Sequence, residues 1–226
     1  MEIIDYKKIM DTRAPESQRR LVEISREDIS PHYSSLTDFM DAALGYEPNL
    51  LRHIDRLISH FLLGAVCKVV NGHYGTVLPK INGKGAVVGG SVIYFSAESG
   101  NVLFHEPITS NLYRWYCFDY FTDDDVFFGE HLLSGRNIAV VHEEKTALLG
   151  KLAYPSLDWL AVGYGSNLTD KMFEKLRGRR AVLFPEDFDL EYWSEHYGSK
   201  LSIDASFIDR DINRYLIDTI LQHKGP

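Results

Sequence analysis

Cysteine is nearly absent from this sequence. The 226 residues contain only two, Cys67 and Cys117, which lie fifty positions apart and form no CxxC pair. A disulfide framework requires several cysteines at regular spacings, and a zinc ribbon requires paired CxxC ligands. The sequence therefore indicates neither kind of scaffold, and we expect both cysteines to be buried small hydrophobes.

Long apolar runs and an excess of positive charge are also lacking. The longest apolar run, near residues 61–67, is far too short to cross a bilayer. The charged start MEIIDYKKIMDTR has no apolar signal-peptide core, so we expect a cytoplasmic protein with no membrane partner. The formal net charge of −8 provides none of the overall Lys and Arg bias that drives non-specific binding to nucleic acid.

The hydrophobic pattern divides the chain into three parts. With 45% hydrophobic and 25% charged residues, the chain can bury a sizeable core. Residues 1–34 have weak periodicity and predict an N-terminal arm with at most one short helix. Residues 35–128 predict leading helices and an antiparallel β subdomain, and residues 129–226 predict a parallel β-α-β domain. The expected fold class is therefore α+β combined with α/β.

Helix and turn signals support the first of these two domains. A helix capped by Ser35 or Thr37 should end at Gly45, and a second helix should begin near Pro48. After Gly64, short β-prone runs alternate with turn signals at Asn71-Gly72, Asn82-Gly83, Gly89-Gly90 and Ser99-Gly100. This pattern predicts antiparallel strands near residues 65–70, 74–78, 86–88, 91–95 and 102–104.

Three short apolar runs support the parallel domain. They cover residues 137–141, 159–162 and 181–184, and they are continuous and bulky, as strands buried on both faces are. The segments between them, residues 145–154 and 168–176, are long enough for helical crossovers. Right-handed β-α-β units with parallel strands are the simplest arrangement of this pattern.

In an open parallel sheet, the residues that follow the strands gather along one ligand-binding edge. Here that edge carries polar groups from all three runs: His142, Glu143, Glu144 and Lys145 after the first, residues 163–167 after the second, and Glu186, Asp187 and Asp189 after the third. Carboxylates, an imidazole and a lysine that converge in this way suit a divalent cation or a metal held against phosphate. The alternative is a set of solvated loop residues.

Several longer segments form a recognisable series: FGEHLL at 128–133, AVVHEEKTA at 139–147, WLAVG at 159–163, LRGRRAVLFP at 176–185, and Trp193. In order and spacing they resemble a bacterial family of Toprim-containing, DnaG-type primase-like proteins that is common on mobile elements. The family pattern is FGEHLL, a strand ending in VESEKTA, WLATGG, LKGRxVxLFPD, and a tryptophan seven residues after that aspartate. The resemblance covers roughly residues 35–220.

The resemblance implies a primase core in which acids after the first and third Toprim strands hold magnesium for nucleotidyl transfer. This sequence departs from the pattern at two of those acids. His142 replaces the glutamate of VESEKTA, and Glu186 replaces the aspartate of LFPD. An imidazole is a poor ligand for magnesium, and the longer glutamate displaces a carboxylate by about one methylene.

The candidate site residues come from the ligand-binding edge of the predicted parallel sheet and from a basic cluster formed by Arg177, Arg179 and Arg180. The catalytic candidates are Glu144, Lys145 and Glu186. Candidates for binding a cofactor are Gly163, Asn167 and Arg179. The candidate ligands for Mg²⁺ or Mn²⁺ are His142, Glu143, Glu186, Asp187 and Asp189. We also expect the Lys145 ammonium within a few ångströms of the acidic edge, paired with Glu144 or Glu186 or in contact with a phosphate.

Three functions fit these observations. The first is a Toprim, primase-like protein of mobile-element DNA replication or transfer, with weakened or lost catalysis, that binds single-stranded DNA or a replication or mobilisation protein. The second is an active metal-dependent nucleotidyltransferase or nuclease with a rearranged acidic site. The third is a protein-interaction module or inhibitor with an acidic face. The sequence leaves the choice and the oligomeric state open.

Overall fold

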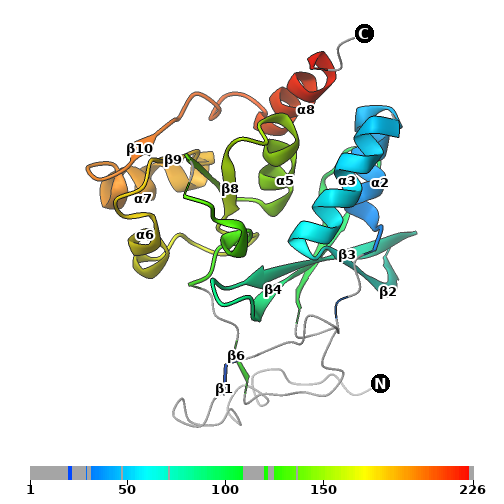
Figure 1. Ribbon diagram of the computed structural model, residues 1–226, viewed down its shortest axis with the longest axis horizontal. Helices are drawn as coiled ribbons and strands as arrows, with labels where there is room; N and C mark the ends of the chain where they lie inside the picture. Colours follow the sequence, from blue (N-terminus) through cyan, green and yellow to red (C-terminus); the bar gives the residue numbers. More distant parts are fainter. Residues whose placement is uncertain are drawn as a thin grey trace.

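The computed structural model describes residues 20–21, 29, 32–46, 48–70, 72–108, 120–121, 125–135 and 137–223. These residues form a four-stranded antiparallel sheet, a four-stranded parallel sheet and the helices that pack on them (Figure 1). A two-residue parallel pair joins β1 (Arg20–Leu21) to β6 (Tyr120–Phe121). Most of the expected N-terminal arm, residues 1–34, lies outside the described residues. No helix among the described residues is long and apolar enough to cross a membrane.

The two leading helices form where the sequence predicts them. Helix α2 spans Ser35–Leu44, and its amino end is held by the Ser34 backbone N–H, which donates to Thr37 Oγ1 at 2.7 Å. Gly45 ends the helix with a φ of 79°, in the left-handed region that glycine adopts without strain. Helix α3 spans Pro48–Phe61 and buries Leu50, Ile54, Leu57, Ile58 and Phe61 along one stripe.

The antiparallel sheet confirms the predicted meander, with one correction. It runs in the order β2 (Gly64–Val70), β3 (His73–Ile81), β4 (Val87–Phe95) and β5 (Val102–Pro107). The predicted turn at Gly89-Gly90 is wrong, because both glycines lie inside β4. Gly90 pairs with Pro79, and a Cβ on it would lie 2.4 Å from the Leu78 carbonyl oxygen. Gly90 therefore permits a close approach of two strands, a role that a sequence signal for a turn does not distinguish.

The second half confirms the expected parallel sheet. Its order is β10-β9-β7-β8, formed by β10 (Ser202–Ile203), β9 (Ala181–Leu183), β7 (Ile138–Val141) and β8 (Asp158–Ala161). The first two crossovers are α5 (Glu144–Ala153) and α6 (Asp170–Leu176). The sequence analysis missed α7 (Asp187–Tyr197) and β10, so Asp187 and Asp189 lie in the first turn of a helix and not in a loop. The last helix, α8, spans Ile212–Gln222.

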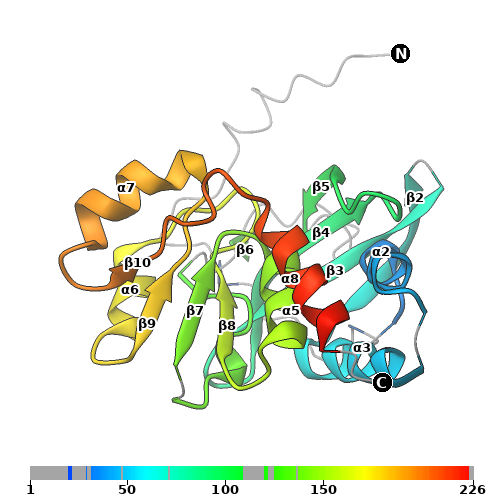
Figure 2. The ribbon, with the colours of Figure 1, turned by 90° about the horizontal axis from the view of Figure 1, so that it is seen from above.

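The helices cover both faces of the parallel sheet (Figure 2). Helices α6 and α7 pack on one face, where Ile138, Val140 and Leu183 contact a buried cluster that includes Trp193. On the other face, Ala139, Val141, Trp159 and Ala161 join a cluster with α5 and α8 that continues into α2, α3 and the antiparallel sheet. The largest core is therefore shared by both halves of the chain. The division at residue 128 stays a prediction.

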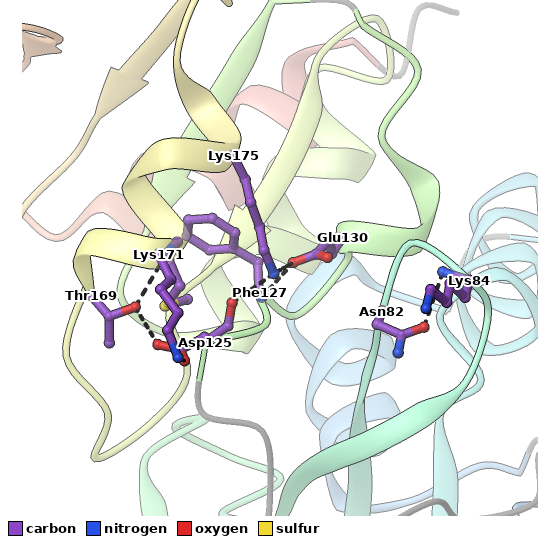
Figure 3. Close-up of polar contacts among 9 residues, drawn as sticks. Asn82, Lys84, Asp125, Phe127, Glu130, Thr169, Lys171 and Lys175 are labelled. Atoms are coloured by element: carbon purple, nitrogen blue, oxygen red, sulfur yellow. Dashed lines mark hydrogen bonds and ion pairs between the residues drawn. The ribbon is translucent and has the colours of Figure 1, made fainter. Parts of the chain in front are cut away.

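The FGEHLL segment is fixed by a group of polar contacts (Figure 3). It includes the 3-10 turn Glu130–Leu132, and Glu130 Oε2 accepts bonds from Lys175 Nζ at 2.7 Å and from the Phe127 backbone N–H at 3.2 Å. Asp125 accepts from Lys171 Nζ at 2.8 Å and from Thr169 Oγ1 at 2.7 Å. These bonds attach the segment that leads into the parallel domain to α6, from its N-cap Thr169 to Lys175 in its last turn.

Candidate functional site

A cleft of about 390 Å³ opens at the carboxyl ends of β7 and β9. It lies at the edge that the sequence predicts, because the strands are parallel and their carboxyl ends meet there. Five of the predicted site residues line it: His142, Glu143, Lys145, Glu186 and Asp187. Arg210, Asp211 and Asn213, around the start of α8, also line the cleft, and sequence reasoning did not select Arg210 or Asn213.

His142, directly after β7, forms a buried ion pair with Asp189. Its Nδ1 lies 2.9 Å from Asp189 Oδ2, and both side chains are almost fully buried. The ring edge of Phe188 also packs on the imidazole, with ring centroids 4.8 Å apart. Burial by itself lowers the pKa of His142, but the carboxylates of Asp189, Glu186 and Glu144 outweigh it and leave the pKa above its ordinary value. The surrounding acids therefore favour the protonated form of the imidazole.

Lys145, in the first turn of α5, lies close to an acid as expected. Its Nζ donates to the Gly100 carbonyl oxygen at 2.8 Å and lies 3.6 Å from Glu143 Oε2. The nearest carboxylate is thus that of Glu143, not that of Glu144 or Glu186. Because Gly100 belongs to the connection between β4 and β5, Lys145 links the parallel domain to the antiparallel sheet.

Glu144 is turned away from the cleft. It is 1% exposed, and its Oε2 accepts from the Tyr164 backbone N–H at 3.0 Å. Burial raises the pKa of Glu144, whereas the charge of Lys80 lowers it. A Cβ placed on Gly163 would lie 3.2 Å from Glu144 Oε1 and 3.3 Å from Lys80 Nζ. Gly163 therefore leaves space for the buried Glu144 and Lys80 side chains. Packing, and not the binding of a cofactor, accounts for glycine at this position.

Lys80 is the main residue that sequence reasoning missed. It belongs to β3 of the antiparallel sheet and is 4% exposed. A buried lysine in a strand is unusual, because burial of an ammonium is costly without an acidic partner. The sequence shows Lys80 between Pro79 and Ile81, but no sequence pattern indicates its burial or the acid that lies near it.

Glu186 holds the position before α7. It is half-buried, and burial together with the nearby Glu143 carboxylate raises its pKa, against the opposing charge of His142. Asp187, one residue on, is exposed and lines the same cleft. Glu143, Glu186 and Asp187 are thus the carboxylates that this cleft presents from the predicted set.

Two predicted residues lie apart from this group. Asn167 is exposed in the loop after β8 and does not line the cleft. Arg179 precedes β9, and the neighbouring Arg180 carbonyl accepts from the Ile138 backbone N–H at 2.8 Å, at the start of β7. Arg179 therefore lies at the amino ends of the strands, the opposite edge of the sheet from Glu186.

The described side chains do not form a ready divalent-cation site. No group of three His, Cys, Asp or Glu side chains among the described residues is placed to hold a metal ion. The chemistry of the donors agrees with this, because His142 is paired with Asp189 and the Lys145 ammonium lies beside Glu143. Ligands engaged by internal cations would have to exchange these partners for the metal.

The His142 pair should make the protein less stable as pH rises above about 6.5, the ordinary imidazole value. Its pKa is raised by folding, so its contribution is complete below the unfolded value and is lost as pH rises through the folded value. Thermal unfolding between pH 5 and 9 measures the effect. Asp189→Asn should reduce this decline, because the imidazole loses the acid that raises its pKa most.

The matched control is Asp187→Asn, which removes an exposed carboxylate from the same first turn of α7. It should keep the pH profile of the unchanged protein. Identical profiles for Asp189→Asn and the unchanged protein above pH 6.5 would contradict the assignment.

Comparisons with known proteins place this geometry in context. A family model described as a domain of unknown function, DUF6371, matches residues 34–187. No curated protein matches the sequence. The primase fragment of the bacteriophage T7 primase-helicase protein aligns with a TM-score of 0.55 and 15% identity, over 93% of this chain and 80% of that one.

Two further solved structures align less closely. The RNA polymerase domain of Mycobacterium tuberculosis primase DnaG gives a TM-score of 0.41 at 13% identity, over 76% of this chain and 65% of that one. The Aquifex aeolicus primase, with its zinc-binding and RNA polymerase domains, gives a TM-score of 0.43 at 11% identity, over 88% of this chain and 62% of that one. This chain spans less than two thirds of both structures. The T7 alignment shows that the mixed α/β fold is similar to that of a primase fragment.

Proposed function

Because this chain belongs to the DUF6371 family, a domain of unknown function, and shares the fold of a primase fragment, we propose that it is a Toprim-containing, primase-like protein of mobile-element DNA replication or transfer. In this proposal it binds single-stranded DNA or a replication or mobilisation protein. Its nucleotidyl-transfer chemistry is weakened or lost.

The ion pair between His142 and Asp189 carries the proposal. It occupies the carboxyl end of β7, where the family pattern has an acid that holds metal. An imidazole at that position supplies no negative charge for a divalent cation, and its protonated form, which the neighbouring acids favour, offsets the charge of Asp189. At the second departure, burial and the nearby Glu143 raise the pKa of Glu186. The imidazole and the raised pKa of Glu186 both reduce the negative charge available to a catalytic metal.

The fold and the charge pattern support a binding role. The strand-end cleft of about 390 Å³ is retained, and Lys145 and Arg210 contribute cations to its lining. Lysine and arginine are the side chains that contact phosphates in nucleic-acid complexes. The carboxylates in the same cleft oppose a bare phosphate backbone, so a protein ligand remains within the proposal.

Primer synthesis tests the catalytic part. The purified chain, with a single-stranded DNA template, ribonucleotides and Mg²⁺ or Mn²⁺, should form little or no primer. A catalytic metal contributes several kcal/mol of transition-state stabilisation, and in this proposal the altered acids no longer hold that metal. In calorimetry, His142→Glu combined with Glu186→Asp should raise affinity for Mn²⁺ by at least about tenfold, which is about 1.4 kcal/mol.

The matched control carries the same two kinds of substitution on the exposed surface of α7, His196→Glu with Glu195→Asp. It should leave Mn²⁺ affinity unchanged. Equal affinities for both double variants would mean that these strand ends are not a degenerate metal site. Fluorescence anisotropy with a labelled single-stranded oligonucleotide then separates DNA from a protein ligand.

An active enzyme with a rearranged acidic site is the second candidate. It is favoured by the presence of Glu143, Glu186 and Asp187 in one cleft. Robust metal-dependent synthesis or cleavage by the unchanged protein, abolished by Glu186→Ala, would establish it in place of the first proposal.

A further inference from the structure

A second cavity of about 330 Å³ lies beside the strand-end cleft and has an aromatic lining. Five rings form its walls, and one carboxylate lies among them: Tyr154, Trp159, Phe184, Phe207, Tyr215 and Asp204. It lies on the face of the parallel sheet that carries α5 and α8, and Phe184 and Phe207 line both cavities. A ligand in the aromatic pocket can therefore extend into the strand-end cleft.

The rings form a continuous wall. Trp159 and Phe184 are nearly parallel, with centroids 6.3 Å apart, and Phe207 follows Phe184 at 6.1 Å. Tyr215 packs on Phe207 at 5.1 Å, and its hydroxyl lies 2.8 Å from that of Tyr154. Tyr215 is nevertheless 45% exposed. The rings of the pocket are thus fixed by contacts with one another, and Tyr215 is accessible to solvent.

The charge at this pocket favours a cation. Among the described residues that line it, Asp204 is the only charged one, and its Oδ1 is fixed by the Ser206 backbone N–H at 3.0 Å. The adjoining cleft is lined by four acidic side chains, Glu143, Glu186, Asp187 and Asp211, and also by Lys145, Arg210 and His142. The whole chain carries a net charge of −8. Aromatic faces attract cations, and an acidic surround raises their local concentration.

We propose that the aromatic pocket binds an arginine side chain from a basic segment of a partner protein. A guanidinium is planar, stacks on aromatic faces and can bond a carboxylate through its fork of N–H groups, which the Asp204 carboxylate accepts. In an extended peptide, side chains two residues apart point the same way and lie about 7 Å apart, so a second arginine can reach the acidic cleft. This site goes beyond the proposed function and does not require nucleotidyl transfer.

A pair of synthetic peptides tests the pocket on the full chain. An acetylated, amidated Gly-Arg-Gly-Arg-Gly peptide should bind in calorimetry at low salt, and binding should weaken as salt is added. The same peptide with citrulline in place of both arginines keeps the shape and loses the charge, and its affinity should be at least about tenfold lower. AMP should neither bind in the pocket nor compete with the arginine peptide.

Three test variants and two controls locate the binding. Asp204→Asn and Tyr215→Leu should each weaken the arginine peptide several-fold, whereas Tyr215→Phe should retain binding because the aromatic face remains. The matched controls are Asp209→Asn, an exposed acid of the same loop, and Tyr192→Leu, a tyrosine of similar exposure on α7. Both should bind as the unchanged protein does, and thermal unfolding confirms that each variant is folded.

Three results would overturn the proposal: no binding of the arginine peptide, equal binding of the citrulline peptide, or binding that Asp204→Asn and Tyr215→Leu leave unchanged. Competition by AMP would assign the pocket to a nucleotide base. None of these results depends on primer synthesis, so this proposal and the proposed function can fail separately.

Discussion

Replacing Lys80 with methionine should lower the free energy of unfolding at neutral pH by about 3–5 kcal/mol, the scale of the penalty when a buried charge loses the opposite charge that compensates it. Lys80 lies close enough to Glu144, which is 1% exposed, for its charge to lower the pKa of that carboxyl, and no described residue donates a hydrogen bond to Glu144 Oε1. Without Lys80, that carboxylate must be buried as an uncompensated charge or take up a proton. Chemical denaturation at pH 7.5 measures the loss.

Two comparisons make this result specific. Lys84→Met, in the exposed turn after β3, removes the same group and should change stability by less than about 0.5 kcal/mol. Glu144→Gln in the Lys80→Met background should restore most of the loss, because a neutral amide needs no counter-charge. The loss should also shrink at pH 5, where a carboxyl with a raised pKa is more readily protonated. A full loss in the double variant would mean that Lys80 acts through its packing alone.

Trp193→Ala should lower the free energy of unfolding by about 3–5 kcal/mol, and the midpoint of thermal unfolding by roughly 6–20 °C. The indole is fully buried between α7 and the sheet, in the cluster that contains Ile138, Val140 and Leu183. It also lies one helical turn after Asp189, so a cavity at Trp193 should loosen the helix that presents Asp189 to His142.

Trp193→Phe keeps most of the packing and should cost much less than the alanine substitution. Glu195→Ala, on the exposed side of the same helix, serves as the surface control. In NMR spectra, Trp193→Ala should shift the His142 imidazole signals and lower its pKa, and Glu195→Ala should not. An unchanged His142 titration would show that α7 is held in place by other contacts.

The sequence predicted those features that depend on local periodicity. The end of the first helix near Leu44, the start of the second near Pro48, the antiparallel meander apart from the false turn inside β4, and the parallel direction of the strands in the second half follow from spacing and from turn residues. The edge that carries His142, Glu143, Lys145, Glu186 and Asp187 follows from the topology. The family resemblance also selected Trp193, and the structure places it in the core.

Pairings between distant elements could not be predicted. His142 and Asp189 were each selected as metal ligands, but their contact depends on α7 beginning at Asp187, which orients Asp189 toward β7. Glu144 begins helix α5 and Lys80 lies in β3 of the antiparallel sheet, and no local pattern relates them. The aromatic pocket likewise combines residues from α5, β8, the end of β9 and α8, which meet only after the sheet has formed.

The core shared between the two sheets has a consequence for hydrogen exchange. Leu78 and Ile93 of the antiparallel sheet belong to the same apolar cluster as Ala139 and Val141 of β7, with α5 and α8 packed between them. Neither half can separate from the other without exposing this cluster to water. Amide protons in β3 and in β7 should therefore exchange with solvent through one common opening of the molecule, at one free energy, as a single foldon.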